Sequence, residues 1–208
     1  TILKGQDADR SGFWLGNPTD ESKEMYYRHF GIKEEKEEVP EEYLRASQVK
    51  TNKAGRSDLE LNLAVSSDMI WISPELDPAT WKHPVRKPMW DFYGGKERHS
   101  LTQPGVFGDC EDVQEVERFD WPDPSYIDFT RTHANVKEAR EAGLAVFGGM
   151  WMPFFHIVAD FFGMENYFMK MYTNPEIVEA VTERVIHFYL EANKRCLDLM
   201  ATDIDAGF

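Results

Sequence analysis

Cysteine and positive charge are both scarce in this chain of 208 residues. Cys110 and Cys196 are the only cysteines and form no Cys-x-x-Cys pair, so free thiols are the simplest expectation and a single disulfide is the alternative. Lysine and arginine number 23 against 37 aspartates and glutamates, which gives a formal net charge of −14. Nucleic acids and anionic membranes bind basic surfaces, so this composition argues against both as partners.

The chain also lacks any apolar run near the roughly 20 residues that a membrane-spanning helix needs, and nothing at its start reads as a signal peptide. Hydrophobic residues still make up 42% of the chain and aromatic residues 13%, enough for a sizeable core. We therefore expect a cytoplasmic protein in which residues 1–208 form a single domain. Thr1 is not a methionine and residues 204–208 read as the opening of a strand, so we expect the natural protein to continue.

Short apolar stretches alternate with helical patterns along the chain. Strands are predicted at residues 13–15, 68–72, the apolar run within 143–151, and 204–208. Helices are predicted at 20–30, from Pro40, at 124–142 with a break, at 153–162 and 164–172, and for about 26 residues from Pro175. Residues 59–65 fit either a strand or a helix.

This alternation of strands and helices is typical of an α/β protein with a parallel sheet. A (β/α)8 barrel needs eight strands, and the chain offers four candidates. We therefore predict the N-terminal part of a (β/α)8 barrel of the TIM type. Residues 81–121 are rich in proline, glycine and aromatic residues, and we expect them to be hairpins and loops inserted between the second and third strands, as a lid over the site.

The strand within residues 143–151 ends in a glycine pair, Gly148 and Gly149, and an apolar helix follows from Pro153. Glycines permit backbone geometry, or a close approach, that a side chain would forbid. A strand that feeds a helix through such a turn is where α/β folds place their chemistry. We interpret this turn, which ends in Trp151, as a wall of the active site.

Two polar side chains follow predicted strands and are candidate catalytic groups. Glu75 comes just after the strand at residues 68–72, where an α/β barrel places catalytic carboxylates; the alternative is a surface or helix-capping glutamate. His156 interrupts the apolar helix at 153–162, either as a group in the cleft or as a core histidine bonded to backbone.

Several stretches resemble the uroporphyrinogen decarboxylase superfamily, which includes corrinoid-dependent methyltransferases. The resemblance is most specific between Gly143 and Glu176, with Phe-Gly-Gly-Met-Trp, an aromatic helix and Met-Tyr-Thr-Asn-Pro-Glu, and extends diffusely to residues 12–14 and 68–71. It is closest to divergent bacterial members described only as decarboxylase-like. The resemblance implies a (β/α)8 barrel, a cleft at the carboxyl ends of the strands, and commonly a homodimer.

The same resemblance implies roles for individual residues. Glu75 stands where the decarboxylases have a catalytic aspartate that faces the pyrrole nitrogens, and His156 stands where they have an active-site tyrosine. Their arginine-bearing segment is replaced here by Gly-Phe-Trp-Leu-Gly-Asn-Pro at residues 12–18, which disfavours a polycarboxylate such as uroporphyrinogen. The methyltransferase branch fits better, with a neutral, aromatic lining for the substrate from these residues: Trp14, Asn17, Trp71 and Trp151.

Three hypotheses follow. The first is methyl transfer from the methylcobamide of a corrinoid protein to a small acceptor, the second is decarboxylation of a porphyrinogen, and the third is a half-barrel without its own catalysis. Methyltransferases of this branch bind zinc through a His-x-Cys pair and a later cysteine. This chain has no His-x-Cys, so we expect no cofactor within it, and corrinoid and zinc only together with a missing second half. Unpaired strand edges favour a homodimer or association with that half.

Overall fold

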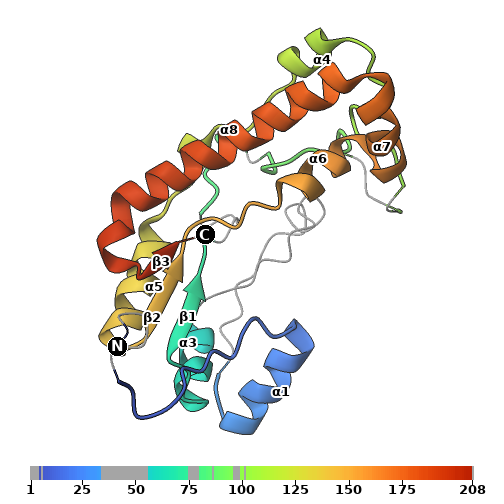
Figure 1. The fold of residues 1–208 in the computed structure, drawn as a ribbon. Coiled ribbons are helices and arrows are strands. Elements are labelled where there is room, and N and C mark those ends of the chain that lie inside the picture. Colours follow the sequence, from blue (N-terminus) through green and yellow to red (C-terminus); the bar gives the residue numbers. More distant parts are fainter. Residues whose placement is uncertain are drawn as a thin grey trace.

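The structure is a computed structural model that describes residues 5, 7–33, 56–74, 80–85, 87–95, 99, 100 and 102–207 (Figure 1). It mixes helices with a small sheet. In chain order the elements are α1 (Asp20–Phe30), α3 (Arg56–Ala64), β1 (Met69–Ile72), α4 (Val113–Arg118), η2 (Pro124–Tyr126), α5 (Thr130–Glu141), β2 (Ala145–Gly148), α6 (Phe154–Phe162), α7 (Met164–Thr173), α8 (Pro175–Met200), η3 (Ala201–Asp203) and β3 (Ala206–Gly207).

The sheet has three parallel strands in the order β1-β2-β3. Met69 to Ile72 of β1 pair in register with Ala145 to Gly148 of β2, and the last two residues of β2 pair with β3. Helix α5 lies between β1 and β2 in the chain, and α8 lies between β2 and β3. The α/β character of the sequence prediction is therefore present, whereas the described residues form an open sheet and no closed barrel.

The predicted strand at residues 13–15 is wrong: this segment is extended but forms no ladder with β1. The backbone N–H of Asp68 does bond the carbonyl of Phe13 at 2.8 Å. The N–H groups of Phe13 and Leu15, however, donate to the side chains of Asp68 and Ser67 rather than to backbone carbonyls. Polar side chains at the start of β1 thus take the place of the ladder that a strand would need.

Most predicted helices are present, because their end signals are local. Thr19 caps α1 through its hydroxyl, and Gly31 closes that helix with φ 69°. The helix predicted at 124–142 is broken, with residues 127–129 between η2 and α5. Residues 59–65 fall within α3 and just beyond it, which resolves the ambiguity as a helix. The helix predicted from Pro40 lies outside the described residues.

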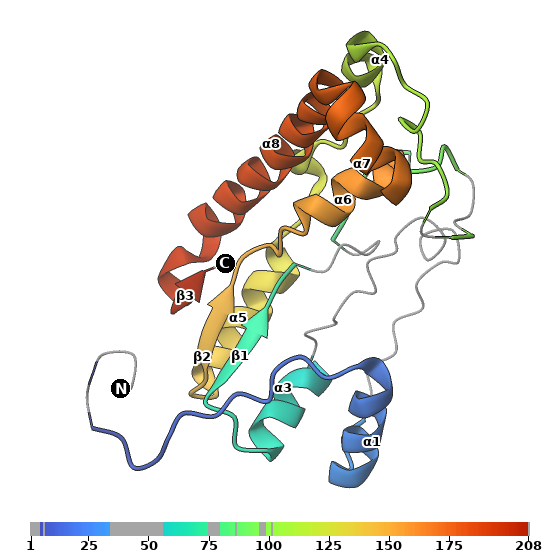
Figure 2. The same cartoon turned by 45° about the vertical axis from the view of Figure 1, so that its right-hand side comes forward.

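Helix α8 runs from the end of the molecule that holds α4 and α7 to the sheet (Figures 1 and 2). Its C-terminal end lies near the sheet, and α4, α6 and α7 gather around its N-terminal half, opposite α1 and α3. Cys196 lies on its buried face, and burial raises the pKa of that thiol to about 11. Both cysteines are buried free thiols, as expected. Asn174, which precedes α8, makes no side-chain bond to the helix, and its amide oxygen accepts from the Thr173 hydroxyl at 2.8 Å.

The inserted segment at residues 81–121 contains helix α4 but no hairpin among its described residues. Its one strand-like contact is an antiparallel bridge between Trp81 and Ile127. Aromatic side chains of this segment are buried against α6 and α8: Trp90 lies 4.9 Å from Phe188, and Phe92 lies 4.9 Å from Phe161, between ring centroids. Side-chain packing therefore makes the described part of this segment core structure, and its role as a lid stays a prediction.

None of the helices in the described part of the chain is long and apolar enough to cross a membrane.

Candidate functional site

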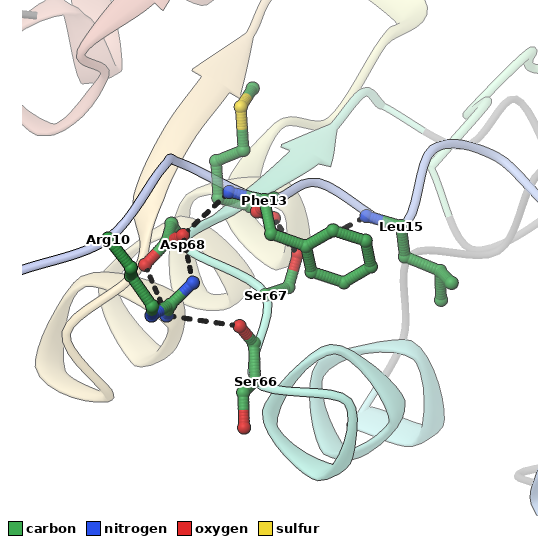
Figure 3. Close-up of polar contacts among 7 residues, drawn as sticks. Arg10, Phe13, Leu15, Ser66, Ser67 and Asp68 are labelled. Atoms are coloured by element: carbon green, nitrogen blue, oxygen red, sulfur yellow. Dashed lines mark hydrogen bonds and ion pairs between the residues drawn. The ribbon is translucent and has the colours of Figure 1, made fainter. Parts of the chain in front are cut away.

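The extended segment at residues 11–18 is fastened to the start of β1 by Asp68 (Figure 3). One carboxylate oxygen of Asp68 accepts the N–H of Phe13 at 2.7 Å. The Arg10 guanidinium donates to both oxygens of the same carboxylate, at 2.8 and 2.7 Å, and to the carbonyl of Ser66 at 3.3 Å. Asp68 thereby fixes the backbone next to Trp14, one of the predicted substrate-binding residues.

A cleft opens between this segment, α1, α3 and the outer edge of β1. It holds about 340 Å³ of empty space, open solvent included. Three of the predicted binding residues, Trp14, Asn17 and Trp71, line it together. The other lining residues are Leu15, Gly16, Pro18, Lys23, Asp58, Leu61, Asn62 and Ile70.

Buried polar side chains from α1 and α3 form the floor of this cleft. Lys23 Nζ lies 2.7 Å from Asp58 Oδ2, and the Tyr27 hydroxyl donates to Asp58 Oδ1 at 2.5 Å. Asn62 Nδ2 donates to the backbone carbonyl of Asp58 at 2.9 Å. All four residues are at least nine-tenths buried. The pairing of Lys23 with Asp58 leaves the floor without net charge.

Helical spacing explains how this floor forms. Lys23 and Tyr27 are one turn apart on α1, and Asp58 and Asn62 are one turn apart on α3, so each pair projects from one face of its helix. The two helices pack against each other, which brings both faces together under Trp14. None of these floor residues is among the predicted site residues, because the contact joins positions 35 apart in the chain.

The glycine turn after β2 is held by an asparagine from α8 that the sequence prediction also missed. Asn193 Oδ1 accepts the N–H of Met150 at 2.7 Å, and its Nδ2 donates to the Met150 carbonyl at 3.3 Å. Gly149 has φ 111°, and a Cβ on Gly148 would lie 2.4 Å from Ile204 Cδ1. Gly149 therefore adopts a positive φ, and Gly148 allows the close approach of Ile204, as the glycine pattern predicted.

Trp151 and His156 do not line the cleft. Trp151 follows β2 and is 50% exposed, and His156 is an exposed residue near the start of α6 whose ring lies edge-on to Phe155 at 5.6 Å. The core-histidine interpretation is therefore wrong. Both belong to a region in which large apolar side chains are unusually exposed: Met152, Phe154, Phe155, Phe168, Met169, Met171 and Tyr172.

Glu75 lies outside the described residues, so its predicted catalytic role stays a prediction. Within the part of the chain that the structure describes, no three His, Cys, Asp or Glu side chains come together as a metal site. The described residues therefore do not fit the zinc that the resemblance implies, and we assign zinc to none of them.

Comparison with known proteins adds no relative: no protein family model, no curated protein and no solved structure matches the chain.

Proposed function

We propose that this chain forms the first units of a (β/α)8 barrel enzyme of the uroporphyrinogen decarboxylase superfamily, and that it takes part in methyl transfer from a methylcobamide to a small acceptor. The observation that carries the proposal is the cleft. The sequence predicts an aromatic, neutral substrate lining from Trp14, Asn17 and Trp71. The first two residues lie in the segment at 11–18 and Trp71 lies in β1, and all three line one depression.

The order of the strands supports the barrel part of the proposal. β1, β2 and β3 are neighbours in chain order, and a helix follows each of the first two strands before the next begins. A barrel adds its strands in this sequential way, whereas a doubly wound sheet reverses its order at a switch point. The exposed apolar side chains around Trp151 favour association, either with further barrel units or with a second copy.

Charge favours a small uncharged acceptor over a porphyrinogen. Among the described residues that line the cleft, Lys23 is the only cation, and Asp58 already pairs with it. These residues offer a polycarboxylate no free positive charge, and the net charge of −14 would repel it. Porphyrinogen decarboxylation is the disfavoured alternative.

In this proposal the cleft residues bind and orient the acceptor. Trp14 and Trp71 exclude water from its apolar part, and Asn17 offers an amide group that can bond its polar part. The methyl donor supplies a methyl group that an acceptor thiolate can attack, once a base has taken the thiol proton. Glu75 and His156 remain the predicted groups for orienting the acceptor or moving that proton.

Equilibrium dialysis against two ligands tests this proposal. We expect the protein to retain methylcobalamin saturably in the presence of 2-mercaptoethanol, and not to retain uroporphyrinogen beyond the Donnan-corrected background. The reason is the lack of a free cation among the described residues that line the cleft. Retention of 2-mercaptoethanol should fall about tenfold, the factor of about 1.4 kcal/mol, in a Trp14→Ala/Trp71→Ala variant, because these two side chains line the cleft that binds the acceptor.

Tyr172→Ala is the matched control, because it removes an aromatic ring that is 92% exposed on α7 and does not line the cleft. It should retain 2-mercaptoethanol like the unchanged protein. Retention of uroporphyrinogen instead of methylcobalamin, or of neither, would contradict the proposal.

A further inference from the structure

Residues 10–15, which we call the strap, lie along the start of β1 and are held there mainly by one aspartate (Figure 3). Asp68 accepts the N–H of Phe13 and pairs with the Arg10 guanidinium through both carboxylate oxygens. Its own N–H donates to the Phe13 carbonyl at 2.8 Å. The bonds between the strap and the Ser67 hydroxyl are longer, at 3.4 Å. Asp68 therefore makes the closest polar contacts between the strap and β1.

Apolar packing contributes little to this attachment. Phe13 and Trp14 are each 43% exposed. Among the described residues, the buried side chains of the main hydrophobic core all come from residues 59–200, so the strap supplies none of them. The Arg10 and Asp68 side chains are 47% and 41% exposed, and an ion pair in water is weak and is screened by salt. A segment attached by a few exposed polar contacts opens more readily than the core.

The residue that follows the strap can act as its hinge. Gly16 has φ 80°, and apart from its chain neighbours no atom lies within 4 Å of the place where its Cβ would be. Beyond it, α1 is held by the buried pair of Lys23 with Asp58, whose side chains are only 9% and 11% exposed. Rotation of the backbone at Gly16 can therefore move the strap away from β1 while α1 stays in place.

The strap also forms one wall of the cleft. Trp14 and Leu15 line the cleft together with Ile70 and Trp71 of β1. With the strap in its observed position the cleft encloses room for about one water molecule, which is less than 2-mercaptoethanol needs. Movement of the strap away from β1 widens the cleft, because both are part of its lining. The acceptor of the proposed function therefore requires this movement.

We propose that the strap is a moving wall of the cleft, held closed by Asp68, hinged at Gly16, and opened to admit the acceptor. The admission of an acceptor rests on the proposed function, whereas the movement does not. Two consequences can be measured. The amide N–H of Asp68 exchanges its hydrogen when the strap opens, and a variant that favours the open form binds the acceptor more tightly.

Native-state hydrogen exchange, followed in ¹H–¹⁵N spectra, tests the movement. The N–H of Asp68 donates to Phe13 in the strap, whereas the Asp68 carbonyl accepts from the N–H of Ala145 in the sheet, at 2.9 Å. Raising NaCl from about 0.01 M to about 1 M should increase exchange at Asp68 several-fold, because the Arg10 pair is exposed, and should leave exchange at Ala145 unchanged. Arg10→Ala should have the same effect at low salt. Asp68→Ala should increase exchange at position 68 by about tenfold.

Gly16→Ala and Gly31→Ala are matched variants for the hinge. Both glycines have positive φ, 80° and 69°, and both have open space where a Cβ would be. Because Gly31 closes α1 and lies outside the strap, only Gly16→Ala should destabilise the closed form and increase exchange at Asp68.

Binding of 2-mercaptoethanol tests the admission of the acceptor. Asp68→Ala should bind it more tightly than the unchanged protein, by about the factor by which exchange increases, since more of the protein is in the open form. A fixed wall predicts no gain in affinity. The dissociation constants are measured by titration in ¹H–¹⁵N spectra.

Exchange at Asp68 that responds neither to salt nor to Arg10→Ala would overturn the inference. Equal increases at Asp68 and Ala145 would overturn it as well, because the strap and the sheet would then open together, and so would unchanged or weaker binding of 2-mercaptoethanol by Asp68→Ala. If exchange responds as expected but neither protein binds 2-mercaptoethanol, the movement stands and the proposed function fails. If 2-mercaptoethanol binds but exchange at Asp68 does not respond, the reverse holds.

Discussion

Asp58→Ala is expected to lower the free energy of unfolding by about 3–5 kcal/mol, the range for breaking a buried ion pair by removing one partner. The side chains of Lys23 and Asp58 are only 9% and 11% exposed. Without Asp58 the Lys23 ammonium would stay buried with no carboxylate beside it, and the Tyr27 hydroxyl would lose its acceptor. Urea denaturation followed by circular dichroism measures the change.

Two further variants distinguish the effect of burying an ion pair from the effect of breaking it. Glu60→Ala removes an exposed partner of Arg56 on the same helix, at 3.3 Å, and should change stability by less than about 0.5 kcal/mol. The double variant Lys23→Met/Asp58→Leu removes both charges together and should recover most of the loss. The account of the cleft floor would be wrong if Asp58→Ala cost no more than Glu60→Ala, or if the double variant were no more stable than Asp58→Ala.

Gly105→Ala is the second large effect that we expect, with a loss of about 3 kcal/mol or more. A Cβ at this position would lie 2.3 Å from the carbonyl oxygens of Asp160 and Phe161 on α6. Those atoms are backbone, so no side-chain rotation can relieve the contact, and overpacking commonly costs about 1–3 kcal/mol even where side chains can yield. Because the inserted segment and α6 share one aromatic core, the loss should appear as a lower midpoint of the whole thermal transition.

Gly207→Ala provides the comparison, since a Cβ there would meet only the carbonyl oxygen of Gly148, at 3.9 Å. It should leave the midpoint within about 2 °C, the equivalent of about 0.5–1 kcal/mol in a protein of this size. Equal midpoints for Gly105→Ala and Gly207→Ala would show that the inserted segment does not pack against α6 as described.

What could be predicted from the sequence was mostly local. Pro175 and the apolar stripe that follows determine α8, and the glycine pair after β2 predicted both a positive φ and a close approach. Residues 13–15 were misjudged because their apolar character matches a strand. Whether their N–H groups bond a ladder depends on Asp68 and Ser67, more than 50 residues away.

In the candidate site, too, some residues could be predicted from the sequence and others depend on contacts between distant parts of the chain. Trp14, Asn17 and Trp71 could be chosen from residue type and from the resemblance, and all three line the cleft. Lys23 and Asp58 could not, because a lysine in an otherwise polar helix is normally solvated. Only the packing of α1 on α3 buries them. Likewise, the sequence does not distinguish Asn193 from the other polar residues of α8, because its contact with Met150 forms only in the folded chain.

The central claim is that Trp14 and Trp71 bind a small uncharged acceptor, and the most direct measurement is an NMR titration of the indole N–H signals. The chain has six tryptophans, so each signal can be assigned with single Trp→Phe variants. Trp81 and Trp121 serve as internal references, because their indole N–H groups bond the carbonyls of Lys87 and Val116, each at 2.8 Å, outside the cleft.

With 2-mercaptoethanol as the acceptor, the account predicts saturable shifts of the Trp14 and Trp71 signals, while those of Trp81 and Trp121 stay in place. Shifts confined to Trp151, or titration with no change at Trp14 and Trp71, would contradict it.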